Sequence, residues 1–164
     1  MQRIKCSFKG GEISMRVAGF DYMDIADTDG LALAVFFSGC CHHCKGCHNP
    51  QLQDFSYGKD YDVMDLLDKL ITDYNKGDYD YIVFSGGDPL CQDHDYIRFL
   101  LRRLTEQGIK VWVYTGFDFG VVPDWCKRYA YCIKCGKYDT RFPKVGKLAT
   151  GNQAYYFKDG RREF

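Results

Sequence analysis

Three short apolar runs most strongly limit the folds open to this chain. They cover Leu31–Phe37, Tyr81–Phe84 and Lys110–Thr115. Near-continuous apolar runs of this length are typical of strands that are buried on both faces of a sheet. Helical patterns separate the runs, and this alternation predicts a parallel sheet built from βαβ units, which is an α/β fold.

Two segments between these runs have the spacing of amphipathic helices. The first begins after Asp62, which is suited to act as an N-cap, and its apolar residues recur at helical spacing to about Tyr74. The second begins after Asp93 and runs to about Gln107, where Gly108 ends it.

Weaker patterns predict smaller elements around this core. Residues 1–30 form an N-terminal extension, residues 31–135 the βα core, and residues 136–164 a closing segment of a single domain. Residues 51–61 are polar, have no period, and are expected to form a loop. The smaller elements are a hairpin of Ile4–Phe8 with Ile13–Val17, a short piece at Phe20–Ile25, a helical turn at Pro123–Tyr129, a strand at Ala130–Ile133, and a hairpin of Tyr155–Phe157 with Arg161–Phe164.

Charge and cysteine content narrow the class of protein. The 164 residues include 22 basic and 22 acidic residues, so no net charge indicates a nucleic-acid or membrane partner. No apolar run is long enough to span a membrane, and residues 1–10 lack the apolar segment of a signal peptide. Nine cysteines in a chain without an export signal indicate a reducing cytoplasm, where they are metal ligands or free thiols rather than disulfides.

A cysteine-rich loop follows the first apolar run. Cys40, Cys44 and Cys47 have the spacing CxxxCxxC. Thiolates are soft ligands that select zinc, Cu(I) or iron–sulfur clusters. Three thiolates on a four-iron cluster would leave one iron free to bind something else, as an open position does in a catalytic zinc site.

The triplet alone leaves a second interpretation open. A structural zinc site of the Cys3His type would use the same three thiolates and take its fourth ligand from His42, His43 or His48. Cys41 interrupts the spacing, and we interpret it as a spare thiol.

Two further loops are expected to meet the cysteine loop. Ser85-Gly86-Gly87-Asp88 follows the second apolar run and Thr115-Gly116 ends the third. Right-handed crossovers place the loops after parallel strands on one edge of the sheet, where such folds build their sites. The paired glycines allow a close approach of backbone to a ligand, and the carboxylate of Asp88 suits an ammonium group.

These segments resemble a known superfamily. The spacing of Cys40, Cys44 and Cys47 after a strand is similar to the cluster motif of the radical S-adenosylmethionine superfamily, and Ser85–Pro89 is similar to its GGE motif, with Asp in the Glu position. More narrowly, the chain resembles the activating proteins of anaerobic ribonucleoside-triphosphate reductase, in order over roughly residues 30–155. The segments that carry this likeness are Phe37–Cys40, Cys44–Pro50, Ser85–Leu90, Trp112–Phe117, Gly136–Tyr138 and Thr150–Gln153.

The resemblance implies a fold and two cofactors. The fold would be an incomplete, TIM-like βα barrel with a parallel sheet and short β additions at both termini. A [4Fe–4S] cluster on Cys40, Cys44 and Cys47 would chelate the amino and carboxylate groups of S-adenosyl-L-methionine through its open iron. No catalytic residue beyond the cluster ligands is expected. The expected contacts to S-adenosylmethionine are Gly46, Ser85, Gly86, Gly87, Asp88 and Thr115.

The resemblance also implies a reaction. The reduced cluster would cleave S-adenosylmethionine to methionine and a 5′-deoxyadenosyl radical, which would take a hydrogen from a backbone glycine of anaerobic ribonucleoside-triphosphate reductase. The electron would come from a one-electron donor such as flavodoxin. Three alternatives remain: an activase of another glycyl-radical enzyme, of the pyruvate formate-lyase type; a radical enzyme that acts on a small molecule; and a non-catalytic iron–sulfur or zinc binding module.

The remaining cysteines depart from the family pattern. Cys135 stands where the family typically has Asp, and it forms a CxxC pair with Cys132, with Cys126 nearby. On a strand, Cys132 and Cys135 are expected to face opposite ways. We therefore expect buried or free thiols here rather than a second metal site.

Overall fold

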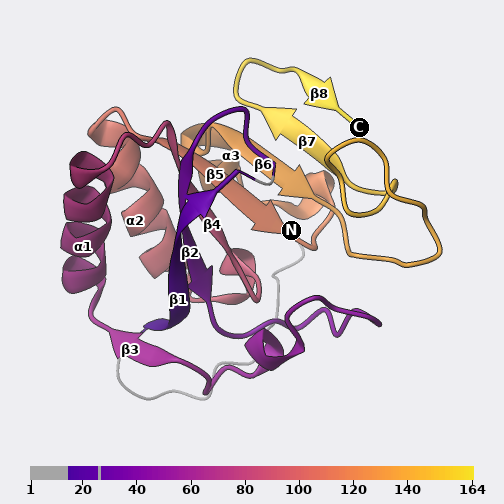
Figure 1. The fold of residues 1–164 in the computed structure, drawn as a ribbon, viewed down its shortest axis with the longest axis horizontal. Coiled ribbons are helices and arrows are strands. Elements are labelled where there is room, and N and C mark those ends of the chain that lie inside the picture. Colours follow the sequence, from indigo (N-terminus) through magenta and orange to yellow (C-terminus); the bar gives the residue numbers. More distant parts are fainter. Residues whose placement is uncertain (1–14, 26) are drawn as a thin grey trace.

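A single mixed sheet organises the chain, in the strand order β3-β1-β2-β4-β5-β6-β7-β8 (Figure 1). The computed structural model describes residues 15–25 and 27–164. The strands are β1 (Met15–Asp24), β2 (Ala32–Phe37), β3 (Lys59–Tyr61), β4 (Tyr81–Gly86), β5 (Lys110–Thr115), β6 (Cys132–Cys135), β7 (Ala154–Phe157) and β8 (Arg162–Glu163). The helices are α1 (Val63–Lys76), α2 (His94–Glu106) and α3 (Asp124–Tyr129), with short 3₁₀ turns η1 (Pro50–Gln53), η2 (Pro89–Cys91) and η3 (Phe119–Val121).

The centre of the sheet is parallel, and its flanks are antiparallel. Strands β2, β4, β5 and β6 pair in parallel, whereas β1 and β3 on one side and β7 and β8 on the other pair antiparallel. This arrangement confirms the predicted α/β fold with β additions on a parallel core. Within the residues described, β3 and β8 are free edges and the sheet does not close, so the partial barrel stays a prediction.

The two faces of the sheet bury different side chains. Leu33, Val35 and Phe37 pack with the apolar faces of the three helices, while Ala32 and Ala34 face a second cluster rich in aromatic residues. This alternation follows from the two-residue period of a strand. All three helices therefore cover one face, as Figure 1 shows.

The buried cysteines of β6 follow the same rule. Cys132 belongs to the aromatic cluster, whereas Cys135 belongs to the helix-side core together with Cys126 of α3. All three are buried, free thiols. The prediction that Cys132 and Cys135 face opposite ways is confirmed, as is their assignment as buried thiols.

Both long helices begin where their caps predict. The side chain of Asp62 accepts a hydrogen bond from the Met64 amide at 2.7 Å, and that of Asp93 accepts from the Asp95 amide at 2.9 Å and from the Tyr96 amide at 3.1 Å. These bonds satisfy amides that have no partner inside the helix.

Several element boundaries differ from the sequence-based expectations. Residues 59–61 were expected in a loop but form β3, an exposed edge strand that carries no apolar pattern because it buries little. Most of the piece expected at Phe20–Ile25 belongs to the ten-residue β1, which ends at Asp24. Register shifts between Val17 and Gly19 and between Asp21 and Asp24 break the alternation of this strand. The last core strand lies at Cys132–Cys135, two residues beyond the predicted range.

The elements predicted near the two ends of the chain are confirmed only in part. The closing hairpin is confirmed, with β7 and β8 joined across Lys158-Asp159-Gly160. The helical turn is also confirmed, although Pro123 is its N-cap rather than its first residue. The predicted N-terminal hairpin of Ile4–Phe8 with Ile13–Val17 lies largely outside the described residues. No helix among those described is both long and apolar enough to cross a membrane.

Candidate iron–sulfur and ligand site

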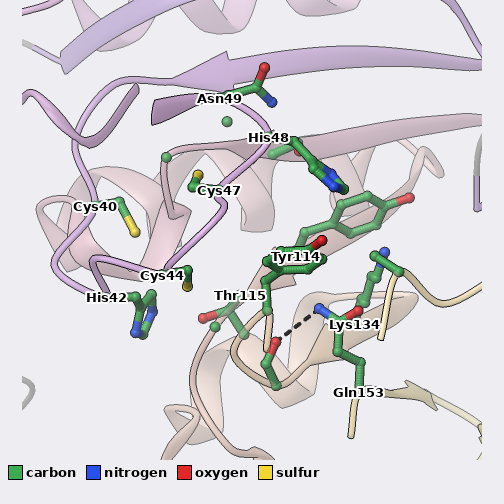
Figure 2. A pocket seen from close by; sticks show the side chains of 17 residues that line it. Cys40, His42, Cys44, Cys47, His48, Asn49, Tyr114, Thr115, Lys134 and Gln153 are labelled. Atoms are coloured by element: carbon green, nitrogen blue, oxygen red, sulfur yellow. Dashed lines mark hydrogen bonds between the residues drawn. The ribbon is translucent and has the colours of Figure 1, made fainter. Parts of the chain in front are cut away.

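A cavity of about 210 Å³ lies at the carboxyl edge of the parallel strands. Parallel pairing aligns the strand ends, with Phe37 of β2 beside Gly86 of β4 and Thr115 of β5 beside Cys135 of β6. The loops after these strands therefore meet at one place, as Figure 2 shows. The lining residues are Cys40, His42, Cys44, Cys47, His48 and Asn49 from the cysteine loop, Ser85, Gly86 and Gly87 at the end of β4, Tyr114, Thr115 and Gly116 at the end of β5, Lys134 in β6, and Gly136, Tyr138, Ala149 and Gln153 after β6.

The cysteine loop is held by backbone bonds. The Gly39 amide donates to the Leu52 carbonyl at 2.8 Å, and the Cys40 amide donates to the Gln53 carbonyl at 3.3 Å. Gly39 has a φ of +104°, a backbone conformation that favours glycine. The turn η1 therefore holds the start of the cysteine loop in place, directly after β2.

The three cysteines of the triplet fit an iron–sulfur cluster. Cys40, Cys44 and Cys47 are free thiols, and all three line the same cavity. Iron–sulfur clusters are held by cysteine thiolates. No fourth cysteine is among the residues lining this cavity, so a cluster held here would keep one position open for a ligand.

The first of these thiols is prepared for ionisation. Interaction with the Cys91 thiol lowers the pKa of Cys40 to about 7, despite the opposing effect of burial. Burial has the larger influence on Cys44 and raises its pKa above the ordinary value. Metal binding requires the thiolate form of a cysteine. Of Cys40 and Cys44, Cys40 therefore ionises more easily and is better suited to bind a metal at neutral pH.

The glycines after β4 permit a close contact between two loops. The Gly87 amide donates to the Phe37 carbonyl at 2.7 Å. A side chain at Gly86 would bring its Cβ to 2.4 Å from the Phe37 backbone, and one at Gly87 to 2.3 Å from the Gly39 carbonyl oxygen. The paired glycines are therefore needed for the β4 loop to pack against the cysteine loop.

Asp88 lies behind the cavity rather than on its wall. Its side chain is 1 % exposed, and it is not among the lining residues. One carboxylate oxygen, Oδ2, lies 2.6 Å from Nε2 of His42 and accepts from Oγ1 of Thr115 at 2.9 Å and from the Gly116 amide at 2.8 Å. The other, Oδ1, accepts from the Leu90 amide at 2.8 Å. The carboxylate thus joins all three loops of the site.

His42 is the link between Asp88 and the cysteine loop. Burial opposes protonation of the imidazole, but the hydrogen bond and negative charge of Asp88 outweigh it and raise the pKa of His42. The ring also packs against Phe117, with centroids 4.4 Å apart. His42 therefore fixes the middle of the CxxxC segment against the ends of β4 and β5.

Lys134, which lines the cavity, forms a buried ion pair with Asp27 that the sequence did not indicate. Nζ of Lys134 lies 2.7 Å from a carboxylate oxygen of Asp27, and the Tyr155 hydroxyl donates to the other oxygen at 2.9 Å. The Lys134 ammonium also lies 5.0 Å from the centre of the Tyr114 ring. A lysine inside a four-residue strand that is otherwise apolar was the one available signal.

The structure brings together most of the predicted site residues. Ser85, Gly86, Gly87 and Thr115 line the cavity with the cysteine triplet, whereas Gly46 and Asp88 do not. A side chain at Gly46 would face Thr140 and Tyr138, and its φ of +73° lies in the region that favours glycine. The contacts that these residues make to S-adenosylmethionine stay predictions.

Cys41 is not a spare thiol. It is disulfide-bonded, which also contradicts the expectation that the cysteines form no disulfides. Its sulfur lies 2.8 Å from the sulfur of Cys91, which is a free thiol, and the Cys41 amide points at the same Cys91 sulfur, 3.4 Å away. Cys91, the last residue of η2, carries no sequence signal because it lies far from the CxxxCxxC spacing.

Comparison with known proteins agrees with this geometry. Residues 26–132 match the family model described as a 4Fe-4S single cluster domain. The chain is 33% identical over 108 residues to the anaerobic ribonucleoside-triphosphate reductase-activating protein of Salmonella typhi, covering 63% of this chain and 70% of the relative. The corresponding protein of Enterobacteria phage T4 is 25% identical over 126 residues, covering 73% of this chain and 79% of the relative.

Two further matches extend the comparison. The pyruvate formate-lyase-activating enzyme of Clostridium pasteurianum is 32% identical over 108 residues, which are 64% of this chain but 45% of the relative, so the chain spans less than half of that enzyme. The solved structure of QueE from Escherichia coli superposes with a TM-score of 0.52 at 14% identity, covering 76% of this chain and 72% of QueE. The likeness to QueE concerns the fold alone.

Proposed function

This chain belongs to the 4Fe-4S single cluster domain family and to the family of anaerobic ribonucleoside-triphosphate reductase-activating proteins, and from that premise we propose that it is a glycyl-radical activase. It cleaves S-adenosyl-L-methionine reductively and generates a glycyl radical on an anaerobic ribonucleoside-triphosphate reductase. The single observation that carries this proposal is the convergence of Cys40, Cys44 and Cys47 with the Gly86-Gly87 turn on one cavity.

Cys40, Cys44 and Cys47 would hold the [4Fe–4S] cluster. When bound, the cluster would supply a binding position for S-adenosylmethionine and the electron for reductive cleavage of its sulfonium group. The protein's own contribution is to bind, orient and exclude water. The backbone of Gly86 and Gly87, with Ser85 and Thr115, forms the wall on which the rest of S-adenosylmethionine rests.

The cavity is small for a ligand-binding pocket. Its volume of about 210 Å³ lies below the ~300–1,000 Å³ typical of small-molecule pockets. The protein substrate is therefore well placed to complete the enclosure, which would exclude water from the reacting atoms when the reductase docks.

The reductase is the preferred partner. The relatives named for it match 70% and 79% of their own length, whereas the pyruvate formate-lyase-activating enzyme matches 45%. Activation of an enzyme of the pyruvate formate-lyase type is the second candidate, favoured by the 32% identity of that match. In either case the chain acts in the cytoplasm and takes its electron from a one-electron donor such as flavodoxin.

Anaerobic reconstitution tests the proposal. The chain is loaded with iron and sulfide, reduced with dithionite, and mixed with S-adenosylmethionine, and 5′-deoxyadenosine is measured by chromatography. We expect product from the wild type and none from Cys44→Ala. Cys126→Ala is the matched control, because this buried cysteine lies in the helix-side core away from the cavity and should retain cleavage.

The second stage tests the partner. Adding the anaerobic reductase should produce the doublet of a glycyl radical in its electron paramagnetic resonance spectrum. A radical on pyruvate formate-lyase alone would favour the second candidate. A cluster that forms but never cleaves S-adenosylmethionine, with or without either partner, would leave a non-catalytic iron–sulfur module and contradict the proposal.

A further inference from the structure

A second group of metal-ligating atoms lies beside the cysteine triplet. Sγ of Cys40, a ring nitrogen of His42 and Sγ of Cys91 all lie within 4.8 Å of one another, and no other such group of three occurs among the described residues. We propose that the cluster-free chain binds a single divalent transition-metal ion of the zinc class at these three residues.

The donor set favours zinc or its analogue cobalt. Two thiolates and one imidazole are the ligands that dominate tetrahedral zinc sites, and oxygen-preferring ions such as magnesium and calcium select against them. The site is enclosed, since Cys40 is 8 % exposed and Cys91 is 1 % exposed. An ion here would be held by two separate segments, the cysteine loop and η2, which limits the geometry it can adopt.

The surroundings offer a fourth donor. Oδ2 of Asp88 lies 2.6 Å from Nε2 of His42 and is also bonded to Thr115 and Gly116. Asp88 lies outside the group of three, so its carboxylate would move toward the ion to complete a four-coordinate Cys2HisAsp set, as expected for a closed zinc site.

This site and the proposed cluster share one ligand. Cys44 and Cys47 do not belong to the group, whereas Cys40 does. A chain loaded with zinc therefore lacks one of the three cluster thiolates, so the two metal centres exclude each other. This last point alone rests on the proposed function; binding of the single ion does not.

Cobalt titration of the reduced, metal-free chain tests the proposal directly. The full-length chain is stripped with chelator under anaerobic conditions and titrated with Co²⁺ alone, and the visible bands of tetrahedral cobalt with sulfur-to-cobalt charge transfer are recorded. We expect one equivalent to bind and one equivalent of zinc to remove the spectrum. Binding should release protons, because the thiols ionise as they coordinate.

Matched cysteine variants separate this site from the triplet. Cys91→Ser should weaken cobalt binding by at least about 100-fold, beyond the ~10–100-fold loss typical of an outer-shell partner. Cys44→Ala should leave it unchanged. Circular dichroism identifies any variant that fails to fold, and in that case His42→Gln replaces Cys91→Ser as the test, because His42 is not part of the core.

Three results would overturn the proposal. Loss of the tetrahedral spectrum in Cys44→Ala but not in Cys91→Ser would put the ion on the cluster triplet. Loss of the tetrahedral spectrum in Cys41→Ala, with the spectrum retained in Cys91→Ser, would assign the sulfur of Cys41 as the ligand instead. Absence of any tetrahedral spectrum in the folded wild type would exclude the site. Failure of the proposed function, by contrast, would show as absent 5′-deoxyadenosine with this cobalt spectrum intact.

Discussion

Replacing Asp88 by asparagine should damage the site through its hydrogen bonds. The change keeps the size and shape of the side chain, so packing is preserved. What changes is that an oxygen becomes an NH2 group, which donates. In the native structure both oxygens face donors, with the Gly116 amide on Oδ2 and the Leu90 amide on Oδ1. Neither amide can accept a hydrogen bond, so either orientation of the asparagine leaves one buried amide facing another donor.

The expected cost can be worked from these contacts. An unsatisfied buried group costs roughly 1–3 kcal/mol, and hydrogen bonds to a charged group contribute roughly 1.5–3 kcal/mol where neutral ones contribute about 1. Asp88→Asn should therefore lower the free energy of unfolding by about 2–4 kcal/mol. This is a large part of the ~5–15 kcal/mol that holds a typical domain folded.

Urea unfolding of the reduced, metal-free chain is the assay. His42→Gln and the double variant complete a cycle with Asp88→Asn, and we expect a coupling energy of roughly 0.5–3 kcal/mol between the two contacting side chains. Asp95→Asn is the control, because that carboxylate is 84 % exposed; its effect should stay within about 0.5 kcal/mol. An unfolding free energy for Asp88→Asn within about 0.5 kcal/mol of wild type would refute the reasoning.

Three more perturbations test individual contacts. Gly87→Ala should lower the urea midpoint by an amount equivalent to about 1–3 kcal/mol, because its Cβ would meet the Gly39 carbonyl oxygen at 2.3 Å; an unchanged midpoint would show that the loops separate easily. Lys134→Met should cost about 3–5 kcal/mol by leaving the buried Asp27 carboxylate without its cation, and Lys134→Met with Asp27→Asn should recover most of that loss. Burial opposes ionisation of Asp73, but hydrogen bonds from Nζ of Lys69 at 2.6 Å and from the Tyr22 hydroxyl at 3.0 Å hold the pKa of Asp73 below its ordinary value. Its stabilisation is therefore complete above about pH 4 and is lost as the pH falls through the folded-state pKa, so the stability difference between wild type and Asp73→Asn should vanish in acid and persist at pH 7.

The elements that the sequence predicted are those whose signal is local. The runs at β2, β4 and β5 are apolar because both faces are buried, and Asp62 and Asp93 mark the helix starts because capping involves residues only two or three positions apart. The meeting of three loops at one edge also followed, since parallel pairing requires it.

The contacts that complete the site were not predictable in this way. His42 and Asp88 are 46 positions apart, and Lys134 and Asp27 are 107 positions apart. Which oxygen of Asp88 faces which donor depends on side-chain orientation after packing, and no residue spacing encodes it. The edge strand β3 escaped notice for a different reason, because three mostly exposed residues carry no apolar pattern.

The close contact between the Gly87 turn and Gly39 makes the cysteine loop a poor candidate for transplantation. Its shape is imposed by backbone from a strand that begins more than forty residues later, at Tyr81. A peptide carrying Phe37–Pro50 would possess every thiolate of the triplet and none of the surface that arranges them. Designers who wish to borrow this centre for another scaffold must therefore import two neighbouring parallel strands along with the loop.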